Sequence, residues 1–162
     1  MTTATETATQ VYRIYIKATP EAIWDAITKP EWTQKYGYRG IGEFDLKPGG
    51  RYEARAPKEM QSMGMPELLV EGEVIEAEAP RKLVHTWRAL WDEEVAAETT
   101  RVTFDIDEDD FGYTRLTVTH ELENAPATAA QVAGEARLQE GGGGWSWILS
   151  DLKSLLESGG SN

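Results

Sequence analysis

Residues 19–30 read TPEAIWDAITKP, and this stretch carries the start, the apolar face and the end of a short helix. Thr19 is suited to cap the helix, and the proline that follows it fits a first helical turn. Ile23 and Ile27 lie at helical spacing, which predicts one buried side. Pro30 ends the helix because proline cannot donate the backbone hydrogen bond that a helix interior needs.

The segments on either side of this helix predict one strand and a second short helix. Residues 11–17 alternate in polarity and place Tyr12, Ile14 and Ile16 on one face, as in a half-buried strand. Pro30 also opens a second short helix that ends by Gly37. The chain therefore begins with a strand followed by two short helices.

The middle of the chain predicts a run of six strands. Turn signals such as Pro48-Gly49-Gly50 and the acidic stretch at residues 107–112 separate segments of alternating polarity. Their hairpin-length spacing indicates an antiparallel meander rather than β-α-β units. The predicted strands are residues 42–46, 51–55, 68–77, 82–90, 100–106 and 113–122.

The last third of the chain predicts helices. A short helical face at residues 129–136 precedes four glycines at residues 141–144, which predict a break or hinge. A long amphipathic helix follows, and its apolar stripe consists of Trp145, Ile148, Leu149, Leu152, Leu155 and Leu156. Trp147 lies off this stripe, so it is either exposed for a partner or covers the flank of a pocket.

These elements predict a single α+β domain over residues 11–158. The Thr- and Ala-rich residues 1–10 are expected to form a disordered tail, and residues 159–162 a flexible one. A chain of 162 residues suits one domain with one core.

Composition excludes several classes of function. Lys and Arg number 16 against 28 Asp and Glu, so the formal charge of −12 argues against binding to nucleic acid or to anionic lipid. The chain has no cysteine, which excludes disulfides, thiolate catalysis and cysteine-based zinc sites. No apolar run is long enough to cross a bilayer, so we expect a cytoplasmic protein.

Several segments, in the same order along residues 11–157, resemble the START-like (helix-grip, SRPBCC) superfamily. They are PEAIWDAITKP at 20–30 with Trp32, PGG at 48–50, VIEAEAPRKL at 74–83 within Gly72 to Trp87, TRLTVTH at 114–120, and GW at 144–145 followed by Leu149, Leu152, Lys153, Leu156 and Glu157. Within the superfamily they are similar to the branch named after the C-terminal domain of the heat-shock-protein-90 ATPase activator. The resemblance implies a curved antiparallel sheet of about six or seven strands that grips the C-terminal helix. It also implies a cavity between the two.

Residues expected to face this cavity come from strands, one loop and the terminal helix. Trp87 and His85 share one face of the strand at 82–90, and His120 is in register with inward apolar neighbours. An apolar wall with a few polar groups is the usual pattern of a ligand site. The predicted lining is Trp87, His85, Phe104, His120, Tyr52, Met60, Met63, Met65, Trp145 and Leu149.

Each of these groups also has a structural interpretation. Trp87 packs on the terminal helix and His85 satisfies a buried carbonyl if both belong to the core. The methionines lie in a long connection at residues 57–66, which forms either a pocket lid or a mobile loop packed at the rim. Neither histidine has a serine or threonine at a spacing that indicates a nucleophile and its base, so binding is favoured over catalysis.

No cofactor or metal is expected from the sequence. Asp105, Asp107 and Asp109 alternate as in a calcium loop, but the required glycine and closing glutamate are replaced by Asp110 and Leu116. The glycine pairs lack the strand, loop and helix context of a nucleotide site.

The leading expectation is therefore a protein that binds a small apolar or amphipathic molecule in the cavity. Two alternatives stay open: a protein-interaction module that assists a chaperone ATPase, and a cyclase- or aromatase-like enzyme that uses His85 or His120. Exposed strand edges also leave room for a homodimer.

Overall fold

The computed structural model describes residues 9–109, 111–133 and 144–158. Most of the expected N-terminal tail, the whole C-terminal tail and glycines 141–143 lie outside these residues. Thr9 and Gln10 already belong to the first strand, which begins two positions earlier than the sequence predicts. Gln10 is held there because its side-chain amide donates to the carbonyl oxygen of Ala129 at 3.2 Å.

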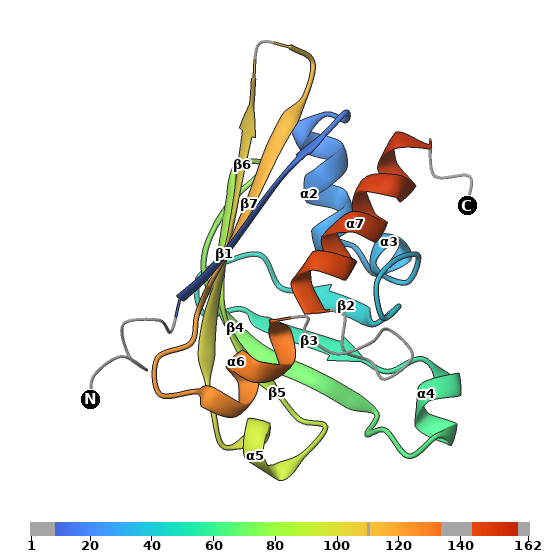
Figure 1. Ribbon diagram of the computed structural model, residues 1–162, viewed down its shortest axis with the longest axis vertical. Coiled ribbons are helices and arrows are strands. Elements are labelled where there is room, and N and C mark those ends of the chain that lie inside the picture. Colours follow the sequence, from blue (N-terminus) through green and yellow to red (C-terminus); the bar gives the residue numbers. More distant parts are fainter. Residues whose placement is uncertain (1–8, 110, 134–143, 159–162) are drawn as a thin grey trace.

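One seven-stranded sheet forms the body of the protein (Figure 1). Its order is β1-β7-β6-β5-β4-β3-β2, and every neighbouring pair is antiparallel. This confirms the predicted meander, with the first strand closing against the last. The strands are β1 (Thr9–Ile16), β2 (Ile41–Phe44), β3 (Arg51–Arg55), β4 (Leu68–Glu78), β5 (Lys82–Ala89), β6 (Thr100–Glu108) and β7 (Thr114–Glu121).

Helices α2, α3 and α7 lie on one face of the sheet, and Figure 1 shows the hairpin of β6 and β7 extending past them. This is the helix-grip arrangement expected from the sequence. The two four-to-five-residue helices α4 and α5 were not predicted, and they lie in connections between strands. The helices are α2 (Pro20–Thr28), α3 (Pro30–Thr33), α4 (Lys58–Ser62), α5 (Glu93–Ala96), α6 (Pro126–Val132) and α7 (Gly144–Glu157).

Helix α2 begins and ends as its sequence predicts. The Thr19 side chain accepts a hydrogen bond from the amide of Ala22 at 3.1 Å, which satisfies one of the free donors of the first turn. At the other end, the amide of Lys29 donates to the Asp25 carbonyl oxygen at 3.0 Å, and Pro30 then starts α3.

The core lies between the sheet and α2 and α7. Ile23 of α2 and Leu116 of β7 are fully buried, and Leu152 of α7 is 1% exposed. Helix α7 contacts β1, α2 and α6. No helix in the described part of the chain is both long and apolar enough to span a membrane.

The opposite face of the sheet carries paired charges, as its alternation predicts. Arg51 of β3 lies 3.3 Å from the Glu71 carboxylate on β4, and Arg88 of β5 lies 2.6 Å from the same carboxylate. These cross-strand pairs are partly exposed, so they favour register more than overall stability.

Candidate functional site

His120, on β7, is fully buried and uses both ring nitrogens in hydrogen bonds. The Trp145 indole nitrogen donates to its Nδ1 at 3.0 Å, and its Nε2 lies 2.8 Å from the Thr100 hydroxyl oxygen. That hydroxyl donates in turn to the Trp87 carbonyl oxygen at 2.9 Å. Because an indole N–H can only donate, Nδ1 accepts, and the neutral ring carries its hydrogen on Nε2.

This network ties helix α7 to three strands of the sheet. With both nitrogens engaged, His120 has no free lone pair for proton transfer in this arrangement. Its position supports the structural interpretation of the residue. Thr100 was missed by sequence analysis, since nothing distinguishes a threonine at the start of β6 from any other strand threonine.

His85, on β5, is also neutral and buried. Its Nδ1 lies 2.7 Å from the carbonyl oxygen of Thr86, so this nitrogen carries the hydrogen and donates it. Burial lowers the pKa of His85 to about 4. Burial, with a smaller contribution from His85, lowers the pKa of His120 to about 3. Both rings are therefore uncharged near pH 7.

Aromatic rings surround the two histidines. Tyr52 of β3 lies with its ring centre 4.5 Å from that of His85, and Trp87 of β5 lies 5.1 Å from His120. We call this group the ring cluster, and it consists of Phe44, Tyr52, His85, Trp87, Trp91, Phe104, His120 and Trp145. It joins residues from β2, β3, β5, β6, β7 and α7 that are far apart in sequence.

Most of the predicted lining residues lie in or beside the ring cluster. Leu149 is 3% exposed and follows Trp145 by one helical turn. Met60, in the middle of α4, and Met65, three residues after its end, are partly buried against the core. Met63 is placed differently: it caps the C-terminus of α4, is 78% exposed and does not touch the cluster.

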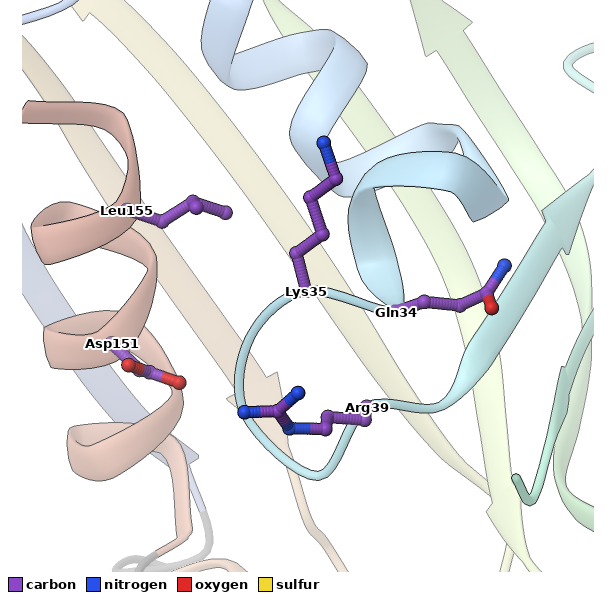
Figure 2. A pocket seen from close by; sticks show the side chains of 5 residues that line it. All are labelled: Gln34, Lys35, Arg39, Asp151 and Leu155. Atoms are coloured by element: carbon purple, nitrogen blue, oxygen red, sulfur yellow. The ribbon is translucent and has the colours of Figure 1, made fainter. Parts of the chain in front are cut away.

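Two surface pockets among the described residues lie away from the ring cluster, since none of its residues lines either of them. One has a volume of about 220 Å³ and lies between α7 and the segment that follows α3, where Gln34, Lys35, Arg39, Asp151 and Leu155 line it (Figure 2). The other, of about 230 Å³, lies over the charged outer face of the sheet beside Arg51, Glu71 and Arg88.

Trp147 packs against the turn at residues 36–39. Its ring meets the Tyr38 ring edge-on at 4.9 Å, and the Tyr38 hydroxyl accepts from the backbone nitrogen of Gly144 at 3.1 Å. Trp147 is thus half-buried against this turn, and it lines neither of the two pockets.

In the acidic tip between β6 and β7, the Asp109 side chain stabilises the turn in which it lies. One carboxylate oxygen of Asp109 accepts from the amides of Phe111 and Tyr113, at 2.9 and 3.3 Å. Within the described ranges, no group of three or more His, Cys, Asp or Glu side chains is placed to hold a metal ion.

Residues 17–157 match the family described as "Activator of Hsp90 ATPase homolog 1-like protein". No curated protein sequence matched the chain.

Solved structures with a similar fold come from bacteria and from a parasite. Protein MLL2253 from Mesorhizobium loti has a TM-score of 0.67 at 22% identity, with 93% of this chain and 97% of that chain covered. An HSP90 activator from Plasmodium falciparum has a TM-score of 0.62 at 22% identity, covering 92% and 96%. CalU16 from Micromonospora echinospora has a TM-score of 0.61 at 19% identity, covering 91% and 75%. At such identities the likeness concerns the fold alone.

Proposed function

The chain belongs to the family of Activator of Hsp90 ATPase homolog 1-like proteins, and from this premise we propose that it binds one small apolar or amphipathic molecule between its sheet and helix α7. The observation that carries the proposal is the ring cluster. Aromatic side chains from four strands, from the connection after β5 and from helix α7 converge there on two uncharged histidines. The cytoplasmic location expected from the sequence is part of the same proposal.

The chemistry of the cluster favours an uncharged ligand with an aromatic or alicyclic body. Aromatic faces offer large apolar contact and prefer edge-on or offset neighbours. The neutral state of His85 and His120 supplies no charge to attract an ion. The polar groups among the apolar walls are few, as is usual in ligand sites: they are the two histidine rings and the Thr100 hydroxyl, which are hydrogen-bonded within the protein.

The partly exposed residues at the edge of the ring cluster favour a ligand entrance beside α4. Phe44, Tyr52 and Trp91 are only partly buried where they pack on the core, as are Met60 and Met65. Flexible thioethers can adapt to ligands of different shape. We therefore assign α4, with Met60 and the nearby Met65, to the lid of the site.

Binding of the neutral fluorophore N-phenyl-1-naphthylamine tests this proposal. We expect its emission to rise on saturable binding to the purified protein, and Phe104→Leu to weaken binding about tenfold, since it removes a cluster ring and keeps an apolar side chain. Native mass spectrometry of protein from its own host, compared with the denatured mass, then gives the mass of a natural ligand.

The matched control is Ile75→Ala, which shortens an apolar side chain that is 37% exposed on β4. It should bind the fluorophore as the unchanged protein does. Absence of saturable binding, or equal weakening by Ile75→Ala and Phe104→Leu, would contradict the site. A Trp87→Ala protein that keeps both its fold and its affinity would do the same.

A second candidate function is assistance to a chaperone ATPase, and an exposed aromatic residue favours it. Phe111, at the tip of the β6–β7 hairpin, is 86% exposed, and neighbouring Tyr113 is 36% exposed. The Asp109 hydrogen bonds hold this tip in shape, so the ring is presented rather than buried. An aromatic side chain of this kind commonly anchors a protein interface.

The test of this candidate is the ATPase rate of the heat-shock-protein-90 chaperone from the same host. We expect the protein to raise that rate, and Phe111→Ala to remove at least half of the increase without changing the melting temperature. The exposed Met63→Ala on α4 should leave the increase intact. A rate that does not respond to the protein would remove this candidate.

The cyclase or aromatase alternative draws no support from the histidine geometry. Both nitrogens of His120 are engaged, and Nδ1 of His85 is used by a backbone carbonyl. The enzyme alternative would regain support if the protein converted a bound ligand and that turnover disappeared when both histidines were replaced.

A further inference from the structure

A turn of four residues, Tyr36 to Arg39, adjoins the 220 Å³ pocket, which Arg39 lines, and the turn is attached to α7. The amide of Gly37 donates to the Asp151 carboxylate at 2.9 Å. The Tyr36 hydroxyl donates to the Ala26 carbonyl oxygen of α2 at 2.9 Å. With the contact between Tyr38 and Trp147, this turn is held to two helices. The pocket is therefore built on a rigid frame.

Arg39 occupies an unusual backbone position in this turn. Its φ is 62°, in the left-handed region that side chains other than glycine rarely adopt. Its amide donates to the Tyr36 carbonyl oxygen at 3.0 Å, which closes the turn. A glycine would adopt this φ without strain. An arginine does so at a cost in conformational energy, and the contacts of the surrounding turn must offset that cost. Figure 2 shows the guanidinium directed across the pocket toward α7.

Two cations on this side of the pocket have no anionic partner among the described residues. Lys35 has its ammonium 4.5 Å from the centre of the Trp32 ring, and neither it nor Arg39 forms an ion pair there. This is notable in a chain with a formal charge of −12. The opposite wall holds Asp151, so the pocket as a whole has one net positive charge.

Apolar surface completes the pocket. Leu155 of α7 is 3% exposed and forms part of the pocket surface. A guanidinium can bind a carboxylate through two parallel hydrogen bonds, whereas the Asp151 carboxylate repels a ligand with more than one negative charge. The pocket volume of about 220 Å³ is below the usual range for pockets that bind drug-sized ligands, so it suits a small molecule.

We propose that this pocket is a second binding site, separate from the ring cluster, for a small organic monocarboxylate. The carboxylate lies against the Arg39 guanidinium, the Lys35 ammonium adds positive charge to the same pocket, and the apolar part of the molecule rests on Leu155. The Gly37 amide is hydrogen-bonded to Asp151, so its NMR chemical shift should change when a ligand occupies the pocket.

Phenylacetate is the probe for this site, and phenylacetamide is its uncharged counterpart. Titration followed by amide ¹H–¹⁵N spectra should give saturable shifts at Gly37 and Arg39 with phenylacetate only. Arg39→Gly should weaken binding at least tenfold, because it removes a charge-assisted contact. It should not impair folding, since glycine adopts a φ of this sign freely. Asp151→Asn, which can still accept from Gly37, should tighten binding by removing a negative charge.

Control variants distinguish binding in this pocket from binding elsewhere on the protein. Lys58→Gln removes an exposed charge on α4 and should leave phenylacetate binding unchanged, and so should Phe104→Leu in the ring cluster. Equal binding of phenylacetamide, tighter binding of inorganic phosphate, or retained affinity in Arg39→Gly would each overturn the proposal. Loss of phenylacetate binding in Phe104→Leu would place the probe in the ring cluster instead, which also overturns it.

Discussion

Replacement of Gly72 by alanine is expected to lower the free energy of unfolding by more than about 3 kcal/mol. A Cβ at this position of β4 would lie 1.9 Å from the carbonyl oxygen of Thr86 on β5. No side-chain movement can relieve that overlap, because the atom belongs to the backbone of the neighbouring strand. The strands must separate, and they do so close to His85 and Trp87 of the ring cluster. Urea unfolding followed by tryptophan fluorescence measures the loss.

Gly40→Ala is the matched control for this effect. The nearest atom to its added Cβ is the Arg55 carbonyl oxygen at 3.7 Å, an ordinary contact, and its φ is not in the left-handed region. We expect a change within about 1 kcal/mol. A Gly72→Ala protein as stable as Gly40→Ala would show that β4 and β5 do not approach each other this closely.

The close approach at Gly72 also explains part of the family resemblance. Gly50 behaves similarly, because a Cβ there would lie 2.0 Å from the Asp45 carbonyl oxygen. Both glycines belong to the segments by which the sequence resembles its family. These two glycines are thus required by close backbone contacts of the sheet, so they identify the fold rather than the function.

Periodicity and caps predicted the elements of the fold. The first strand, predicted at residues 11–17 and observed at Thr9–Ile16, the helix at Pro20–Thr28 and the stripe of α7 all follow from local patterns, and each element was confirmed. The short helices α4 and α5 lie in connections, where four or five residues give no measurable period. The amide of Val95 donates to the Asp92 carboxylate at 3.1 Å, and an aspartate at this position is a local signal that would have indicated α5.

The site could be predicted only in part. Alternation placed His120 on the inward face of its strand, but its partners Thr100 and Trp145 are 20 and 25 positions away. They meet because the β6–β7 register and the docking of α7 bring them together, and no local pattern encodes that. The packing of Trp147 on Tyr38 is equally a tertiary contact. Whether the rings leave room for a ligand depends on such contacts as well.

The second large effect is a loss of stability on mild acidification, for which His85 and His120 are responsible. Their pKa values in the fold are about 4 and about 3, whereas an exposed histidine in the unfolded chain has its ordinary value of 6.5. Below pH 6.5 the unfolded chain therefore binds protons that the folded protein does not. The free energy of unfolding falls as the pH falls, by about 1.4 kcal/mol per pH unit for each histidine.

Both contributions are fully present above pH 6.5. The loss from His85 ends near pH 4, and the loss from His120 near pH 3, where each buried ring also takes up a proton. Together they predict a decrease of about 2 kcal/mol per pH unit near pH 6, which steepens toward about 3 kcal/mol per pH unit near pH 5, a large share of the stability of a domain this size. Carboxylates with lowered pKa values, such as Glu53 and Glu157, add their own losses only below their ordinary value of 4.5.

Urea unfolding at pH 7.5, 6.0 and 5.0 measures this slope, and the double variant His85→Gln with His120→Gln isolates it. A glutamine at position 120 can accept from Trp145 and donate to Thr100, so the network keeps its partners while its titration is lost. The double variant should be nearly flat between pH 6 and 5, apart from the background of the remaining charges. If it does not fold, histidine ring signals of the unchanged protein decide the question. They should remain those of neutral imidazole down to pH 5, and a midpoint near 6.5 for either ring would show that the ring is not held neutral by the fold.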